Sequence, residues 1–562
     1  MDRDAIMKET PSFNVNCNAD INRLLSSVTA SVRVFAEGHQ EQIRRLTSIG
    51  AALSAEQNIE RLLEMIVDEA RRFTNSDGGT LYITSEDKKR LHFAIVQNDS
   101  LTTRMGGTAG EITWPPVDLF QDEGKPNYAN VSSYAALSGE VVNIPDVYDA
   151  DQFNFEGTRK FDATTGYRSQ SMLVVPMRNH ENDIIGVLQL LNSKNKMTGD
   201  TIPFSRECQE MTESLASQAA VALTNRRLIK DLENLFESFI KTIATAIDEK
   251  SPYTGDHGRR VVELTMMIAE AINMAEEGPF CDIFFNEHQL NELRIAAWLH
   301  DVGKVAIPEH VMDKSTKLDG LFDRIELLKM RFEVAKRDIE IAALKKGIDP
   351  AKDIPEYESA SAECKYELQN LDDDLEFLLR TNEGGEFMPD ESVARVKSIA
   401  GKTVKVLGQR VPMLDEEEIK NLIIRKGTLS EKERKIIHGH ATITHKMLSQ
   451  LPFPKKLKNV PLFAGAHHEC INGSGYPRGL KGEEIPLQAR ILAVADIFEA
   501  LTAPDRPYRK ANTLSGALKI LGYMARDNHI DADIHSLFVK NKVYLTYAKK
   551  ELSPSQIDKD NL

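Results

Sequence analysis

Residues 205–247 contain neither proline nor glycine, and this stretch constrains the fold of the chain more than any other. Side chains suited to a seam between helices step along it by 4, 3, 4, 3 and 4: Val221, Asn225, Leu228, Leu232, Leu235 and Phe239. This heptad pattern predicts a long linker helix in a dimeric coiled coil, with the single Asn fixing a parallel register. The alternative is one amphipathic helix that packs on its own domain. The helix then enters a globular core, as a second apolar line predicts: Phe236, Ile240, Ile243 and Ile247.

The part of the chain before this helix has a mixed α/β pattern over residues 48–195. An amphipathic helix begins near residue 59 and is followed by short β-rich runs at 79–83, 91–96, 171–176 and 184–192. Because Gly, Asn and Asp separate these runs, the pattern predicts an antiparallel sheet with flanking helices, an α+β domain. Residues 1–47 are expected to form a loose tail and a helix.

Residues 248–550 are expected to form an all-α domain, followed by a tail at 551–562. A separate block lies within it at 316–425 and carries two heptad lines. The first comprises Leu321, Ile325, Leu328, Phe332, Ala335, Ile339 and Ala342. The second comprises Cys364, Leu368, Leu371, Leu375 and Leu378. With a turn at Gly347-Ile-Asp-Pro, the pattern predicts a helical hairpin inserted into the larger domain.

Composition excludes several classes of protein. A chain of 562 residues suggests two to four folded units, and a net charge of −15 argues against a nucleic-acid binder, which needs a basic face. The five cysteines contain no CxxC pair, which fits reduced thiols. No apolar run is long enough to span a bilayer, and the first ten residues lack a signal pattern. We therefore expect a cytoplasmic protein without membrane insertion.

His300-Asp301 is the first candidate for chemistry. An apolar helix, Ala296-Ala-Trp-Leu, delivers the pair, and Lys304 follows one turn later on the same side. An adjacent imidazole and carboxylate can bind a metal pair, with the carboxylate bridging. A lysine at that spacing can act as a fixed positive charge for a phosphate.

Further candidate metal ligands follow in order along the chain. Asp496 lies in an otherwise apolar helix, Ile491-Leu-Ala-Val-Ala-Asp, where a buried carboxylate requires a cation or a proton. The others are histidines: His257, His440, His467 and His468. Taken singly, each has an ordinary alternative, such as a capped helix end, a surface His or a hydrogen-bonded core Asp. Together, imidazoles and carboxylates suit Fe, Mn, Zn or Ni better than Ca or Mg.

Two segments carry a specific resemblance. HHECINGSGYPRGLKGEEIP (467–486) and DIFEALTAPDRPYR (496–509) resemble signature segments of the HD-GYP family, the cyclic di-GMP phosphodiesterase branch of the HD hydrolase superfamily. The resemblance covers about 240–315 and 425–545. It implies a metal-dependent hydrolase that converts cyclic di-GMP to the linear dinucleotide, GMP or both.

The resemblance also implies roles for individual residues. Asp301 corresponds to a bridging metal ligand, and Lys304 to a catalytic lysine near the scissile phosphate. The remaining ligands correspond to His257, His300, His440, His467, His468 and Asp496. The substrate-binding residues correspond to Lys304, Gly475, Tyr476, Arg506 and Arg509. The implied cofactors are two divalent transition-metal ions, with Fe or Mn favoured and Zn or Ni as alternatives.

Three departures from the family pattern bear on these expectations. Tyr253 stands where a three-metal variety carries Glu, which favours two metals. The segment between Asp496 and Arg506 is one residue longer than the commonest form, so the position of Arg506 is open. The 316–425 block separates Asp301 from His440. Because the flanks resume the family pattern, we interpret the block as an insertion near the mouth of the site.

The first half of the chain resembles a GAF domain, on the segments Gly139-Glu-Val-Val-Asn-Ile-Pro-Asp, Phe153-Asn and Thr165-Gly-Tyr-Arg-Ser-Gln-Ser. The GAF domains of cyclic-nucleotide phosphodiesterases and adenylyl cyclases are the most similar. This resemblance implies a sensory domain with a small-molecule ligand such as a cyclic nucleotide. The candidate pocket residues are Asn154, Asp162, Thr165 and Arg168, and the alternative is that they only support the fold.

The sequence leaves the substrate open. Cyclic di-GMP is the leading expectation, and a mixed cyclic GMP-AMP dinucleotide is a rival because no base-reading residues are evident. A non-catalytic receptor for a cyclic dinucleotide is a third alternative, against which the intact ligand set argues. We expect a homodimer in each case.

Overall fold

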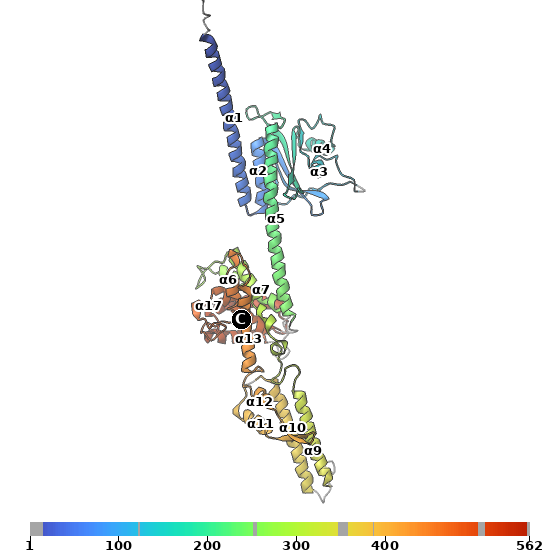
Figure 1. The fold of residues 1–562 in the computed structure, drawn as a ribbon, viewed down its shortest axis with the longest axis vertical. Coiled ribbons are helices and arrows are strands. Elements are labelled where there is room, and N and C mark those ends of the chain that lie inside the picture. Colours follow the sequence, from blue (N-terminus) through green and yellow to red (C-terminus); the bar gives the residue numbers. More distant parts are fainter. Residues whose placement is uncertain are drawn as a thin grey trace, which may run out of the picture. The chain divides into compact units, whose positions relative to one another are not determined.

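The computed structural model describes residues 15–121, 124–250, 256–346, 358–385, 387–503 and 512–558 (Figure 1). The chain forms two compact units, Met1–Asn234 and Leu235–Leu562. The fold class expected from the sequence is confirmed, because an α/β unit with an antiparallel sheet is followed by a mostly helical one. None of the described helices is both long enough and apolar enough to cross a membrane.

The first unit is built on one antiparallel sheet with the strand order β3-β2-β1-β7-β6-β5. Its long strands are β1 (Ser76–Thr84), β2 (Arg90–Asn98), β6 (Met172–Arg178) and β7 (Ile184–Lys194), at the four places that the sequence predicts. The short strands are β3 (Thr103–Gly106), β4 (Val117–Asp118), β5 (Val142–Ile144) and β8 (Thr201–Ile202); β4 pairs with β2, and β8 pairs with β7.

Helices cover both faces of this sheet. Alternate strand residues point to opposite sides of the sheet, so neighbouring apolar residues of one strand belong to different cores. Leu81, Leu173 and Leu188 pack on one side, in a core that includes α2 (Ile59–Thr74) and residues 215–223 of α5. Tyr82, Val174 and Val187 pack on the other side, in a core that includes α3 (Val131–Ser138). Figure 1 shows α2 and α5 on one side and α3 on the other, with α4 (Glu156–Thr165) beside α3. α1 (Val15–Ala55) joins the first core through Ile49 and Leu53.

The expected linker helix is α5 (Arg206–Asp248). Its heptad seam is exposed in the single chain, where the apolar members from Val221 to Phe239 keep between 43% and 68% of their surface. The second apolar line behaves differently, because Ile240, Ile243 and Ile247 pack in a core with Leu299 and Leu457. The coiled coil itself stays a prediction.

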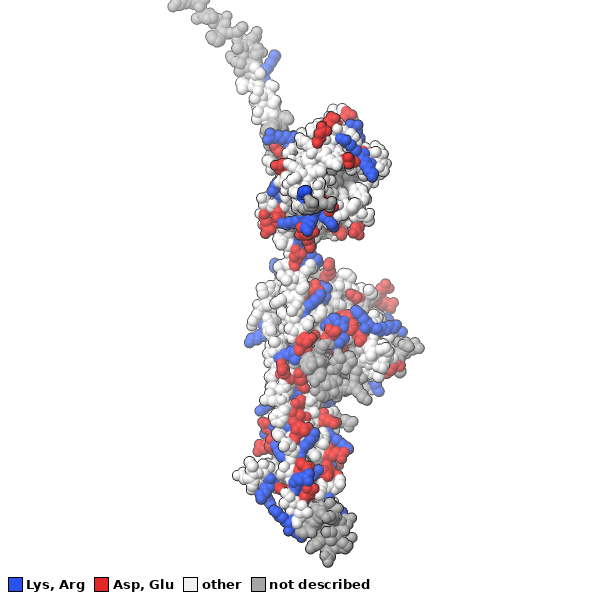
Figure 2. Space-filling view, turned by 90° about the vertical axis from the view of Figure 1, so that its right-hand side faces the viewer, with Lys and Arg blue, Asp and Glu red and all other residues white. Residues whose placement is uncertain are grey.

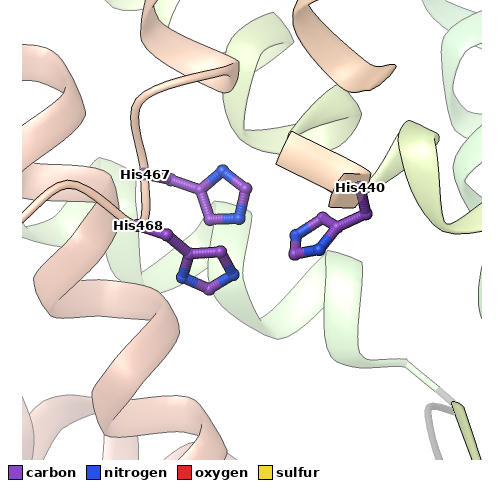
Figure 3. A group of neighbouring side chains, drawn as sticks. All are labelled: His440, His467 and His468. Atoms are coloured by element: carbon purple, nitrogen blue, oxygen red, sulfur yellow. The ribbon is translucent and has the colours of Figure 1, made fainter. Parts of the chain in front are cut away.

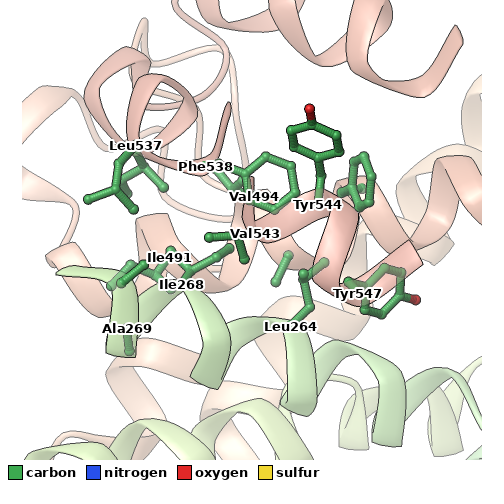
Figure 4. Packing of buried hydrophobic residues seen from close by; sticks show 14 of the residues in the cluster. Leu264, Ile268, Ala269, Ile491, Val494, Leu537, Phe538, Val543, Tyr544 and Tyr547 are labelled. Atoms are coloured by element: carbon green, nitrogen blue, oxygen red, sulfur yellow. The ribbon is translucent and has the colours of Figure 1, made fainter. Parts of the chain in front are cut away.

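The second unit packs its helices around a large core (Figure 4). α6 (His257–Asn273) contacts α7 (Glu287–Leu299) and α15 (Leu487–Thr502). Leu264 and Ile268 of α6 meet Ile491 and Val494 of α15 in this core, with Phe538 beside them. Outside the 316–425 block, the described part of this unit also contains α8 (Glu309–Met312), α13 (Glu431–Leu448), α14 (Val460–Ala464), α16 (Leu514–Arg526), α17 (Ala532–Lys540) and α18 (Val543–Glu551); η3 (Val302–Ala306) is a short 3₁₀ helix.

The 316–425 block has a core of its own, which includes Leu328, Phe332, Leu371 and Leu378. Its elements are α9 (Ile325–Lys345), α10 (Glu358–Glu383), α11 (Asp390–Ala400), the strands β9 (Thr403–Val406) and β10 (Gln409–Pro412), and α12 (Glu416–Leu422). α9 and α10 form the helical pair that the two heptad lines predict. The expected turn at Gly347-Ile-Asp-Pro lies outside the described residues.

Charges of both signs occur together on one face of the molecule. On the face drawn in Figure 2, Lys and Arg side chains are interspersed with Asp and Glu.

Candidate metal centre

The seven candidate ligands come from five parts of the second unit and meet at one site. His257 begins α6, His300 and Asp301 follow α7, and Asp496 lies in α15. His440 comes from α13, and His467 and His468 follow α14. Figure 3 shows the rings of His440, His467 and His468 turned toward one another. Six of the seven residues are buried, and His468 is partly exposed.

Asp301 lies between two groups of histidines. Its Oδ2 atom is 3.5 Å from His257 Nε2 and 3.2 Å from His300 Nε2. Its Oδ1 atom is 3.4 Å from His440 Nε2 and 3.9 Å from His467 Nε2. Asp496 faces the same space, with Oδ1 3.4 Å from His257 Nε2 and Oδ2 4.0 Å from His468 Nδ1. One carboxylate thus presents an oxygen to each group, which is the arrangement that a bridging ligand requires.

Backbone carbonyls orient three of the imidazoles. The Nδ1 atoms of His300, His440 and His467 lie 2.7, 2.5 and 2.6 Å from the carbonyl oxygens three residues earlier in the chain. An Nδ1–H that donates to a carbonyl leaves the lone pair on Nε2, the atom that faces Asp301. These three Nε2 atoms are buried and have no hydrogen-bond partner among the described residues.

A divalent metal ion fits this donor set. A buried polar atom without a partner costs free energy, and metal ions bound beside the rings would satisfy all three Nε2 atoms. The geometry separates into two groups that could each hold an ion: His257 with His300 and Asp301, and His440 with His467 and His468. Imidazole and carboxylate donors favour Fe, Mn, Zn or Ni.

The electrostatics of the site keep its two carboxylates ionised but act differently on the two histidine groups. Burial by itself would lower the pKa values of His257 and His300, but Glu499 raises the pKa of His257 well above its ordinary value and Asp301 raises that of His300. Burial by itself would raise the pKa of Asp301, but Lys304 and His300 hold it well below its usual range. Burial lowers the pKa of His467 well below its ordinary value and that of His468 to about 4. Ionised carboxylates and neutral imidazoles are the forms that bind metal.

A cavity of about 380 Å³ opens beside the site. Lys304, in η3, lines this cavity and places its Nζ atom 2.6 Å from Asp301 Oδ2. The cavity wall also includes His257, Asp301, His468 and Asp496, and an apolar strip of Ile497, Ala500, Leu501 and Met524. The cavity can therefore receive a ligand with an anionic part and an apolar part. A larger cavity, of about 660 Å³, lies at Lys250, Val305 and Leu321, and none of the described residues that line it is a candidate ligand.

Hydrogen bonds, close backbone packing and a ring stack hold the loop that carries Gly475 and Tyr476 next to the site. The Glu469 carboxylate accepts hydrogen bonds from the backbone N–H groups of Arg478 and Leu480, at 2.7 and 2.9 Å. A Cβ atom at Gly475 would lie 2.2 Å from the backbone nitrogen of Cys470, so this position requires glycine for the close backbone packing. Tyr476 stacks on His438, with ring centroids 3.9 Å apart, and lies 4.8 Å from the ring of His468.

Two groups at the site were not predicted from the sequence. His438 belongs to no recognised motif, and its contact with Tyr476 forms only in the folded chain. Glu499 is fully buried and bonds His257. Its signal was available, because it repeats one turn after Asp496 as a second acid in an apolar helix. Arg506, Arg509 and Tyr253 lie outside the described residues.

The candidate pocket residues of the first unit make local contacts. Asp162 is buried and accepts hydrogen bonds from Tyr148 Oη and from the backbone and side chain of Ser169. The guanidinium of Arg168 lies 4.6 Å from the ring centroid of Tyr148. Asn154 accepts from the N–H of Glu156, and Thr165 donates to the carbonyl of Phe161. These contacts support the fold, and the role of the four residues in ligand binding stays a prediction.

Family comparisons agree with this architecture. Residues 58–223 match the GAF domain, and residues 254–361 and 416–534 match the HD domain. The chain is a GAF–HD protein. The two HD matches leave residues 362–415 of the 316–425 block unmatched, and the bounds of the insertion stay a prediction. The HD domain also supports divalent metal binding at the site.

Several curated proteins are similar to parts of the GAF–HD chain. A 3'3'-cGAMP-specific phosphodiesterase 3 of Vibrio cholerae is 46% identical over 105 residues, which are 18% of this chain and 22% of that protein. The cyclic di-GMP phosphodiesterase response regulator RpfG of Xanthomonas campestris is 37% identical over 132 residues, 23% of this chain and 34% of that protein. The matched segments thus span 22% and 34% of these relatives' own length. The solved GAF domain of an Acinetobacter phosphoenolpyruvate-protein phosphotransferase aligns with 34% of this chain and 98% of its own, at 14% identity and a TM-score of 0.26.

Proposed function

We propose that the GAF–HD protein is a phosphodiesterase of the HD-GYP type that hydrolyses cyclic di-GMP. The coarser activity, that of an HD-domain phosphodiesterase, is supported by the family and by the names of its relatives. The observation that carries the proposal is the position of Asp301, with one oxygen toward each histidine group and Lys304 beside it at the cavity.

The seven candidate ligands would hold two divalent ions, of which Fe or Mn suits the donors best and Zn or Ni is an alternative. Such ions supply Lewis acidity, which lowers the pKa of water and offsets charge on a phosphate. The protein orients the imidazoles through their Nδ1 atoms and keeps Asp301 and Asp496 ionised. Lys304 adds a fixed positive charge where the phosphate would lie. The apolar strip of the cavity can contact a nucleobase or a ribose.

Hydrolysis adds one water across one phosphodiester bond of the ring and gives the linear dinucleotide. A second hydrolysis gives two GMP. Arg506, Arg509, Gly475 and Tyr476 are proposed to bind the substrate, the two arginines through its phosphates. The stack of Tyr476 on His438 supports this placement of the loop, since it holds an aromatic ring beside His468.

The GAF domain is proposed to regulate this activity through α5, in a homodimer, in response to a small molecule such as a cyclic nucleotide. Two contacts at the end of α5 support this route. Asp248 accepts a hydrogen bond from the backbone N–H of Gly258, next to His257. Lys250, just past the helix, donates to the carbonyl oxygens of Lys304, Val305 and Ile307, at 3.2, 2.7 and 2.7 Å. A shift at this end of α5 would therefore move both backbone segments that carry the site.

A mixed cyclic GMP-AMP dinucleotide is the second candidate substrate, favoured by the 46% identity to a 3'3'-cGAMP-specific enzyme. Purified protein loaded with Mn²⁺ or Fe²⁺ should be assayed on cyclic di-GMP, 3'3'-cGAMP, cyclic AMP and cyclic GMP, with products resolved by liquid chromatography. We expect the highest kcat/KM for cyclic di-GMP. Faster turnover of 3'3'-cGAMP would reassign the substrate, and binding without turnover would identify a receptor.

A further inference from the structure

Glu499 is a fully buried carboxylate that contacts a candidate metal ligand without being one itself. Its Oε2 atom lies 2.5 Å from Nδ1 of His257, and its Oε1 atom accepts a hydrogen bond of 2.7 Å from Nε of Arg260. His257 and Arg260 lie one turn apart on α6, and Asp496 and Glu499 lie one turn apart on α15. Four charged or polar side chains, two from each helix, thus contact one another between α6 and α15 beside the site.

His257 differs from the other oriented imidazoles in its Nδ1 partner. His300, His440 and His467 each use a backbone carbonyl three residues earlier, a partner that their own chain segment supplies. His257 is the first residue of its helix, so α6 contains no carbonyl three residues before it. A carboxylate from α15 takes that place.

The chemical difference matters for metal binding. An ionised carboxylate attracts the Nδ1 proton more strongly than a backbone carbonyl does, which makes Nε2 a better electron donor, and partners of this kind also fix the orientation of the ring. Arg260 holds the carboxylate in place and stabilises its negative charge through a charge-assisted hydrogen bond. Burying a carboxylate is costly, and the contacts of Glu499 with His257 and Arg260 offset part of that cost.

We propose that Glu499, held by Arg260, is a positioning residue that selectively raises the metal affinity of the group formed by His257, His300 and Asp301. The inference rests on the proposed metal centre. Glu499 acts on the other group less directly, because His440 and His467 use backbone carbonyls and no hydrogen bond among the described residues joins Glu499 to His440, His467 or His468. The alternative is that Glu499 and Arg260 form a structural ion pair between α6 and α15.

Titration of metal-free protein with Mn²⁺, followed by electron paramagnetic resonance, distinguishes the positioning role of Glu499 from a structural ion pair with Arg260. Glu499→Gln keeps the size of the side chain and removes its charge. We expect one of two Mn²⁺ ions to bind about 10–100-fold more weakly, the range typical of lost partners of this kind, with the other ion unchanged. Glu499→Asp retains the charge on a shorter chain and should weaken the same ion by less.

Glu418→Gln is the matched control. Glu418 is also fully buried and pairs with an arginine, Arg331, at 2.7 Å, but it lies in the 316–425 block. This variant should bind both ions as the parent does. Unchanged affinity for both ions in Glu499→Gln and Glu499→Asp would overturn the inference, as would equal loss of both ions in Glu499→Asp with its helical content preserved. A parent chain that binds no Mn²⁺ would instead reject the metal centre itself.

Discussion

The Nζ atom of Lys304 lies 2.6 Å from Oδ2 of Asp301, the carboxylate that separates the two histidine groups. Burial alone would lower the pKa of this lysine, but attraction to Asp301 raises it, so the ammonium form is stable beside the site. The side chain also lines the cavity and retains 26% of its surface. It can therefore contact both the ligand cluster and a bound phosphate.

The variant Lys304→Met tests whether the lysine acts on a bound phosphate as well as on the ligand cluster. The substitution keeps an unbranched apolar side chain of similar length and removes the positive charge. We expect the metal content to stay at the parent level while kcat falls about 10²–10³-fold, as for other lost transition-state charges. Metal analysis and turnover of the same preparation check the two effects. Lys519→Met, on the exposed side of α16, should leave both unchanged, and an equal loss of metal and activity in Lys304→Met would show that the lysine only supports metal binding.

The metal content of the chain is itself a prediction. Two groups of ligands, and the absence of Glu at position 253, favour two ions per chain. Elemental analysis of purified protein should give about two transition-metal ions. A chelator should also lower the melting temperature of the second unit, because a bound ligand stabilises the folded state by about 2.7 kcal/mol at 100 times its Kd. Three tightly bound ions at full occupancy would contradict this interpretation.

Much of the fold was predictable because its signals are local. The short runs of apolar residues in β6 and β7 indicate strands, and the His-Asp and Gly-Tyr-Pro segments indicate a known site. β3, β4, β5 and β8 have two to four residues, too few to show a period. The contact of Glu499 with His257 joins residues 242 positions apart, so only tertiary packing reveals it.

The expected insertion can be tested by removing it. Thr428 Oγ1 donates to the carbonyl of Lys314 at 3.2 Å, so the chain enters and leaves the block at neighbouring points. The block also has its own apolar core. Replacement of residues 316–425 by a short Gly/Ser linker should give a soluble protein that binds as much metal as the parent. Insoluble aggregate would show that the block belongs to the core of the second unit.

The exposed seam of α5 leads to a prediction about register. One residue inserted after Glu233 turns the following helix by about 100° and shifts it by about 1.5 Å, whereas seven residues restore the phase. One added Ala should therefore change activity or its regulation, and seven added residues should largely restore the parent behaviour. Light scattering should report a dimer for both. A monomer at micromolar concentration, or equal effects of one and seven residues, would refute signalling through a coiled coil.

The central claim is that Asp301 organises a metal centre that hydrolyses cyclic di-GMP. Its most direct test compares the full chain with Asp301→Ala, both loaded with Mn²⁺ or Fe²⁺, by following cyclic di-GMP and its products with mass spectrometry. Circular dichroism should confirm that both proteins are folded. We predict that the parent converts cyclic di-GMP to the linear dinucleotide or GMP and that Asp301→Ala has no activity above background. Undiminished turnover in the variant, or a parent that binds cyclic di-GMP and releases it intact, would contradict the claim.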